Sequence, residues 1–252
     1  MASNKEQLTG CFKALSLSGV RDYYEDLSRV AEQETMSYKD YLLELLLREC
    51  EIRYNKRIAR LLKASKLPLE KNLENFDLKR LPPKLHHKVK TLLEGSFVDS
   101  RDNILAFGNP GSGKTHLLCA IGLELVQKNR PVRYTTCSLL VQELLIAKRD
   151  LELEKMLNKL SRFDVIIIDD FGYVQQTREE MEVLFTLMTY RYERGSIMIT
   201  SNLPFSKWES IFKDPMTTAA AIDRLVHHSV ILEMNIPSYR MEAAKEGKRD
   251  QA

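Results

Sequence analysis

The sequence predicts a three-layer α/β/α domain around a parallel sheet, preceded by a small all-helical domain. Gly108 to Thr115 matches the phosphate-loop pattern G-x-x-x-x-G-K-[ST], between an apolar run typical of a strand and a helical pattern. Four consecutive β-branched residues then lead into Asp169 and Asp170, as in a buried parallel strand. Residues 1–67 show helical periodicity instead. Together these observations indicate an α/β nucleotide-binding core with a helical N-terminal extension.

The first domain, residues 1–67, is expected to hold three helices and to make an oligomer, partner or DNA contact. An apolar face begins at Leu8 and is interrupted by Gly19, and Ser37 resembles the N-cap of a long third helix. The second half of that helix is basic and includes Arg57 and Arg60. A basic helix can follow a phosphate backbone. A solvated face or a subunit contact explains it equally well, so both interpretations stay open.

Residues 68–83 are expected to form a linker, because three prolines and a polar stretch break the helical pattern. Phe76 lies within it and could stack on an adenine base or pin the linker to the core. The second domain is expected to span residues 84–252 and to begin with a helix that ends at Gly95.

The phosphate loop carries the clearest chemistry. Successive backbone N–H groups form a concave anion site, to which the following helix adds its positive dipole end. Lys114 is expected to reach the β- and γ-phosphates of ATP, and the Thr115 hydroxyl to bind Mg²⁺. The expected nucleotide contacts are Gly108, Asn109, Pro110, Gly111, Ser112, Gly113, Lys114, Thr115, His116 and Phe76.

Further candidate residues follow the expected strands of the core. Functional sites lie at the carboxyl ends of parallel strands, so Asp169 is expected to hold Mg²⁺ and Asp170 to orient or deprotonate the attacking water. Asp170 could instead cap a turn. Asn202 follows another strand and faces the same crevice, unless it is only a turn residue. Further along, residues 219–225 form an expected helix that contains Arg224, and residues 229–233 are expected to close the sheet.

The composition limits the function classes. No apolar run is long enough for a membrane span, and no signal-peptide pattern opens the chain, so a cytoplasmic protein without a membrane partner is expected. The four cysteines are scattered and read as reduced packing residues. Two histidine pairs lack the spacing of metal ligands. The net charge of +3 permits nucleic-acid binding without arguing for it.

The order of the motifs resembles one branch of ATPases. Gly-Asn-Pro-Gly-Ser-Gly-Lys-Thr-His-Leu, Ile-Ile-Ile-Asp-Asp-Phe-Gly-Tyr, Thr-Ser-Asn-Leu-Pro-Phe and Asp-Arg-Leu together resemble the AAA+ ATPases of the DnaC/DnaI helicase-loader branch. Within that branch the chain is most similar to the IstB-type helper ATPases of insertion-sequence transposases. The motifs span about residues 76–240.

This resemblance implies roles for single residues. Gly108 to Thr115 is Walker A, Asp169 with Asp170 is Walker B, Asn202 is sensor 1, and Arg224 is an arginine finger that completes a neighbour's site. It also implies Mg²⁺-dependent ATP hydrolysis by a homo-oligomer promoted by ATP and DNA, with duplex DNA and a transposase as partners. The chain departs from the wider pattern at Asp170, where many AAA+ proteins carry Glu. No C-terminal lid is expected, and Arg240 could replace a lid-borne sensor.

Duplex DNA has two candidate surfaces. In an AAA+ ring or spiral the segment between Walker A and Walker B can face the central axis, which favours Lys148 and Arg149 over Arg57 and Arg60. Two other functions stay open. A replicative helicase loader shares the ATPase core, whereas a small-molecule P-loop kinase would leave the Asn202 and Arg224 motifs without a role.

Overall fold

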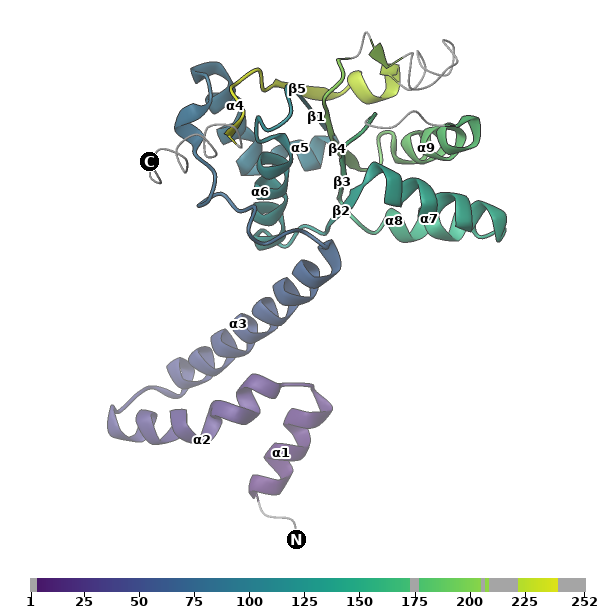
Figure 1. Cartoon of the computed structure of the whole chain (residues 1–252). Coiled ribbons are helices and arrows are strands. Elements are labelled where there is room, and N and C mark those ends of the chain that lie inside the picture. Colours follow the sequence, from purple (N-terminus) through teal and green to yellow (C-terminus); the bar gives the residue numbers. More distant parts are fainter. Residues whose placement is uncertain (1–3, 173–176, 205–206, 209–221, 240–252) are drawn as a thin grey trace, which may run out of the picture. The chain divides into compact units, whose positions relative to one another are not determined.

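The computed structural model describes residues 4–172, 177–204, 207–208 and 222–239 (Figure 1). The chain divides into two compact units, Met1–Arg60 and Leu61–Ala252. This division lies a little before Leu67, where the sequence places the end of the helical domain. The stretch expected as a linker therefore falls within the second unit, where Leu67 and Leu81 are buried.

The first unit is helical, as the periodicity predicts. It contains α1 (Asn4–Ala14), α2 (Ser18–Gln33) and most of α3 (Tyr38–Ser65), with Val20, Leu27 and Leu45 at its core. The buried carboxylate of Glu49 accepts hydrogen bonds from the backbone N–H groups of Gly19 and Val20, at 2.5 and 3.1 Å. A carboxylate at this place satisfies amide groups that the first turn of α2 leaves without intrahelical partners.

Gly19 does not have the structural role that the sequence pattern predicts. It lies in the first turn of α2 and does not interrupt the apolar face of the preceding helix. A Cβ atom on Gly19 would stand 2.7 Å from Ile52 Cδ1 and 2.8 Å from Glu49 Oε2. The glycine is therefore needed for the close approach of α2 to α3, a tertiary contact that the local pattern does not reveal.

The second unit is built on a five-stranded sheet in the order β2-β3-β4-β1-β5, with every neighbouring pair parallel. Figure 1 shows α4, α5 and α6 on one face of the sheet and α7, α8 and α9 on the other. The three-layer α/β/α architecture predicted from the sequence is thus confirmed. The strands are β1 (Asn103–Phe107), β2 (Val132–Thr136), β3 (Val165–Asp169), β4 (Ser196–Ser201) and β5 (Ser229–Glu233). The helices are α4 (Pro83–Glu94), α5 (Ser96–Ser100), α6 (Lys114–Gln127), α7 (Cys137–Arg149), α8 (Leu153–Leu160) and α9 (Arg178–Arg191).

The central strands are apolar because helices cover both of their faces. Every residue of β1, β3 and β4 is buried. On one side, Ile166 and Ile168 belong to the core under α7 and α9. On the other side, Ile167 packs against Gly122 of α6, where a Cβ atom would approach Ile167 Cδ1 to 2.8 Å. The helix that follows the phosphate loop is therefore fixed closely on the sheet.

The helix ends mostly follow their sequence signals. Gly95 ends α4 in the left-handed conformation, with φ of 86°. Thr177 and Glu180 form a capping box at the start of α9. The N-cap of α7 is Thr136, whose side chain accepts from the amide of Leu139.

The described residues contain no helix that is both long and apolar enough to cross a membrane. The four cysteines are free thiols. Cys119 and Cys137 are buried, as expected of packing residues, whereas Cys11 and Cys50 are exposed, so the packing role was wrong for these two. Burial raises the pKa of the Cys119 and Cys137 thiols to about 12, so both remain protonated packing groups.

Candidate functional site

The candidate site lies at the carboxyl ends of β1, β3 and β4, where the strand order brings distant segments together. The phosphate loop leaves β1, Asp169 ends β3, and Asn202 follows β4. An open cavity of about 950 Å³ is lined by Lys114, Thr115, Asp169, Asp170 and Asn202, among others. The structure therefore places the principal candidate residues around one cavity.

The phosphate loop depends on glycine at three positions. Gly108, Gly111 and Gly113 have φ of 149°, 79° and 90°, in a region that disfavours residues with a Cβ. A Cβ on Gly108 would also lie 2.3 Å from the Met234 carbonyl oxygen, and one on Gly113 would lie 3.1 Å from the Phe76 ring. The loop is thus packed between residues that precede the core and residues that follow β5.

The segment Met234–Tyr239, which we call the strap, runs along the phosphate loop. Its first amide donates to Phe107 O at 2.6 Å, and its last donates to Gly111 O at 3.0 Å. The guanidinium of Arg80 donates to Pro237 O at 3.3 Å and lies 5.2 Å from the centre of the Tyr239 ring. Ile236 and Tyr239 line the cavity, so the strap forms one of its walls.

Lys114 is buried, and its ammonium group donates to Gly108 O at 2.8 Å and to Asn109 O at 2.9 Å. These contacts hold the positive charge beside the loop amides. The hydroxyl of Ser112 is buried with no hydrogen-bond partner in the described part of the chain. A buried unpaired hydroxyl is costly, so this atom is suited to a polar ligand in the loop.

Asp169 is held by three hydroxyl groups from three different elements. Its Oδ1 accepts from Thr115 Oγ1 at 2.7 Å and from Thr200 Oγ1 at 2.5 Å, and its Oδ2 accepts from Tyr134 OH at 2.8 Å. Burial, together with the nearby Asp169 charge, raises the pKa of Tyr134 far above its ordinary value. The phenol therefore remains protonated and donates. Thr115 and Asp169 were both expected to bind Mg²⁺, whereas Tyr134 and Thr200 were not among the candidates.

Asp170 and Asn202 are both exposed on the wall of the cavity. Asp170 has φ of 58°, a left-handed conformation that aspartate tolerates better than most side chains. Its amide donates to Thr200 Oγ1 at 2.9 Å. Thr200 thus joins both aspartates, since its hydroxyl accepts from one and donates to the other.

Phe76 and His116 lie at the outer side of the phosphate loop. Their ring centres are 5.3 Å apart at an angle of 59°, and His116 Nε2 donates to Asn72 O at 2.8 Å. Both residues line the cavity. Phe76 therefore packs against the core and at the same time borders the space where a base could bind.

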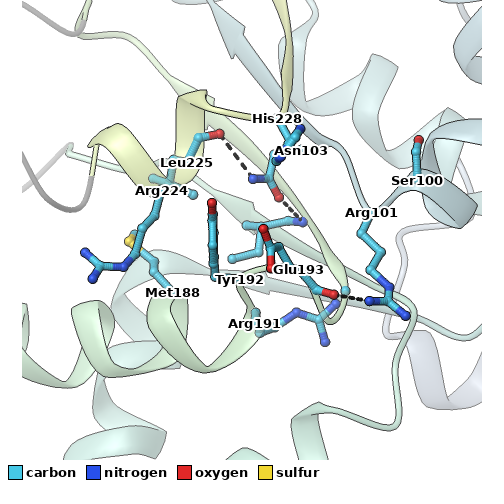
Figure 2. A pocket seen from close by; sticks show the side chains of 12 residues that line it. Ser100, Arg101, Asn103, Met188, Arg191, Tyr192, Glu193, Arg224, Leu225 and His228 are labelled. Atoms are coloured by element: carbon cyan, nitrogen blue, oxygen red, sulfur yellow. Dashed lines mark hydrogen bonds between the residues drawn. The ribbon is translucent and has the colours of Figure 1, made fainter.

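Arg224 lines a pocket together with Asn103, the first residue of β1, and so lies at the end of the sheet away from the phosphate loop; Figure 2 shows both residues. The neighbouring Leu225 accepts through its carbonyl from Asn103 Nδ2 at 3.1 Å, and Asn103 is the first residue of β1. Since β1 rises about 3.3 Å per residue, roughly 13 Å of strand separates Asn103 from Phe107, the residue that precedes the phosphate loop. The Arg224 guanidinium lies 5.1 Å from the centre of the Phe185 ring.

A second cavity of about 260 Å³ lies beside Arg224 and is drawn in Figure 2. Beneath it the buried guanidinium of Arg191 donates to four backbone carbonyl groups. Burial lowers the pKa of Arg191 to about 10. This arginine ties the end of α9 to the starts of β3 and β4, and we assign it a structural role.

The four basic candidates for DNA contact are in different environments. Lys148 Nζ forms an ion pair with Glu182 Oε2 at 2.8 Å, whereas Arg149 is exposed. In the first unit, Arg57 and Arg60 are both exposed on α3. Arg240 lies outside the described residues.

Comparison with known families identifies the family of proteins to which this chain belongs. The family model described as IstB-like ATP binding protein matches residues 10–247, which is most of the chain. The chain belongs to the IstB-like ATP-binding protein family. It is therefore an ATP-binding protein of the kind that insertion sequences encode, as the motifs predicted.

Individual relatives agree with this family. The IstB-like chain is 42% identical over 236 residues to an insertion-sequence ATP-binding protein of Sinorhizobium fredii, covering 93% of this chain and 79% of the relative. It is 33% identical over 250 residues to the ATP-binding protein of insertion sequence IS5376 from Geobacillus stearothermophilus, covering 98% of this chain and 100% of the relative.

Solved structures confirm the AAA+ fold. AMPPCP-bound DnaA from Aquifex aeolicus has a TM-score of 0.57 and 22% identity, covering 73% of the IstB-like chain and 56% of that chain. A DnaI structure has a TM-score of 0.56 and 22% identity, with coverage of 67% and 94%. At these identities the likeness concerns the fold alone.

Proposed function

We propose that this IstB-like chain is a Mg²⁺-dependent ATPase that assembles on duplex DNA, remodels it and recruits a transposase. The family and its insertion-sequence relatives support the transposition setting. The single observation that carries the catalytic part is the contact between Thr115 Oγ1 and Asp169 Oδ1, at 2.7 Å, beside the phosphate loop. It joins the two residue types that a nucleotide-bound magnesium ion uses in P-loop proteins.

The donor set fits Mg²⁺. A hydroxyl and a carboxylate oxygen are hard ligands, and Mg²⁺ is usually bound by one or two such groups together with phosphates and water. The described residues hold no cluster of three His, Cys, Asp or Glu side chains that would form a complete protein cage. We therefore assign Thr115 and Asp169 to the ion. When bound, it would neutralise charge on the phosphates.

The other residues are assigned by position. Lys114, already beside the loop carbonyls, would exchange these contacts for the β- and γ-phosphates. Asp170 is exposed to the cavity, as a residue that orients or deprotonates water must be. Asn202, also on the cavity wall, would bind the γ-phosphate or that water. Phe76 and His116 would border the base and the loop.

Assembly is proposed from the position of Arg224. Arg224 is at the amino ends of the strands, and it could reach a γ-phosphate only on another copy of the chain. In that position it would stabilise charge on the transferring phosphoryl group. The proposed duplex contact uses Lys148 and Arg149, with Arg57 and Arg60 as the alternative surface.

Two variants test the catalytic assignment. We expect Lys114→Ala to lower ATP affinity at least about 100-fold, since it removes the cation from the phosphate site. Asp170→Asn should keep ATP affinity within about threefold while turnover falls about 100-fold or more, as for loss of a general base. Binding would be measured with a fluorescent ATP analogue and turnover by phosphate release. Wild-type turnover in Asp170→Asn would show that Asp170 does not activate water.

A replicative helicase loader is the second candidate, because the solved structure of the DnaC helicase loader shares the fold, with a TM-score of 0.54. The insertion-sequence relatives are more similar in sequence and match nearly the whole chain, so we favour the transposition role. Stimulation of DNA insertion by the cognate transposase, compared with loading of a hexameric helicase, separates the two. None of the relatives and structures named above is a small-molecule kinase.

A further inference from the structure

We propose that Tyr134, acting with Thr200, is a positioning residue that holds Asp169 for the divalent cation and so sets cation affinity. The inference rests on the proposed nucleotide site. It adds Tyr134, which lies outside the motifs, and it gives a role to Thr200, the first residue of the Thr-Ser-Asn motif. It follows from the sheet order, in which β3 lies between β2 and β4. Strand β2 supplies Tyr134, β4 supplies Thr200, and Asp169 ends the strand between them.

The geometry fixes both carboxylate oxygens. Tyr134 OH lies 2.8 Å from Oδ2, and Thr200 Oγ1 lies 2.5 Å from Oδ1. Each is a hydrogen bond to an ionised acceptor, which is stronger than a bond between neutral groups. A carboxylate held at both oxygens cannot rotate about its terminal torsion without breaking one of these bonds. The orientation of Asp169 is thus set before any ligand enters.

The hydroxyls of Thr200 and Tyr134 differ in their further hydrogen bonds. Thr200 is buried and also accepts from the amide of Asp170 at 2.9 Å, so it has a structural duty in the turn after β3. Tyr134 is half-buried, and its hydroxyl donates to Asp169. Removing the Tyr134 oxygen therefore isolates the effect on the carboxylate with the least disturbance of the fold.

Orientation matters because Thr115 shares Oδ1 with Thr200, at 2.7 Å. When the Thr115 oxygen ligates a cation, its proton can still be donated to Asp169. The carboxylate must therefore stay where it accepts that proton and also faces the ion. Partners of this kind, which orient a metal-binding residue, typically affect metal affinity about 10- to 100-fold.

The test compares Tyr134→Phe with a matched control, Tyr190→Phe. The Tyr190 hydroxyl donates to Asn158 Oδ1 at 2.6 Å, so the control loses an equivalent hydrogen bond away from the cavity. Full-length protein is mixed with ADP, which removes turnover from the measurement. Binding of Mn²⁺, as a paramagnetic substitute for Mg²⁺, is followed by electron paramagnetic resonance. ADP affinity is measured separately in EDTA.

We expect Tyr134→Phe to weaken Mn²⁺ binding in the ADP complex by about tenfold or more. ADP affinity in EDTA should stay within about twofold of wild type, and Tyr190→Phe should change neither value. Thr200→Val should show the same loss of Mn²⁺ affinity, and Thr200→Ser, which keeps a hydroxyl, should restore it. This second pair keeps the test valid if Tyr134→Phe fails to fold.

The outcomes separate this inference from the proposed function. Wild-type protein that binds no Mn²⁺ beyond that held by free ADP would refute the proposed metal site, and the inference with it. Wild-type protein that binds Mn²⁺, with Tyr134→Phe binding it equally well, would refute only the role of Tyr134. Equal loss of ADP affinity with and without the cation would assign Tyr134 to the fold, which also overturns the inference.

Discussion

Arg224 offers the sharpest test of assembly. Lys114 and Arg224 belong to opposite ends of the same sheet, so one chain cannot bring them to the same phosphate. We expect Arg224→Ala to keep its fold and its ATP affinity and to lose hydrolysis. Removal of an arginine finger reduces turnover about 10³- to 10⁵-fold, which corresponds to about 4–7 kcal/mol of transition-state stabilisation. Lys114→Ala should be equally inactive for a different reason.

Mixing the two inactive proteins should restore activity. In an equimolar random assembly with head-to-tail interfaces, half of the subunits carry an intact Lys114 and half an intact Arg224. About one interface in four then combines both, so turnover should return to roughly a quarter of the wild-type value. Phosphate release with saturating ATP and duplex DNA measures it, and native mass spectrometry confirms that mixed assemblies form. Mixed assemblies without recovery would place Arg224 outside catalysis or in its own chain's site.

Two further predictions concern the basic surfaces and the first unit. Lys148→Ala/Arg149→Ala should weaken duplex binding in ATP and lower the salt slope by about 0.9 for each phosphate that is no longer neutralised. Arg57→Ala/Arg60→Ala should change duplex affinity and salt slope little. The reverse pattern in a salt titration would place DNA against α3. Burial raises the pKa of Glu49, but the hydrogen bonds to its carboxylate outweigh burial and hold that pKa below the ordinary value. The carboxylate therefore stabilises the folded unit above the unfolded pKa of about 4.3, and this stabilisation is lost as pH falls through the folded pKa. Glu49→Gln should lower the free energy of unfolding of the first unit by about 2 kcal/mol at pH 7 and flatten its pH dependence. Hydrogen exchange in α2 measures both effects, and unchanged exchange would show that this carboxylate does not stabilise the unit.

The sequence predicts the parts of the site that are continuous in the chain. The phosphate loop is recognisable because its glycines, Lys114 and Thr115 stand at fixed spacing. Asp169 is recognisable because an uninterrupted apolar strand ends there. Both signals are local, and the structure brings both residues to the cavity as expected.

The partners of these residues were not predictable in the same way. Tyr134 and Thr200 donate hydrogen bonds to Asp169 from the two neighbouring strands, so their roles depend on strand order and not on sequence spacing. In a strand pattern, a tyrosine and a threonine are ordinary residues. The strap was missed for a related reason. Its contact with Gly111 joins positions far apart in the sequence, and no local pattern reveals such a contact.

The pairing of β1 with β5 has a consequence for synthesis of the protein. Strand β1 is apolar and lies inside the sheet, yet the residues of β5 that pair with it are synthesised 126 residues later, as in the pair Asn103 and Ser229. At about 5–20 residues per second, the edge of β1 stays open for on the order of ten seconds. An open apolar edge invites pairing with other chains. Because the strap follows β5, the phosphate loop acquires its full set of neighbours only once translation has passed Tyr239.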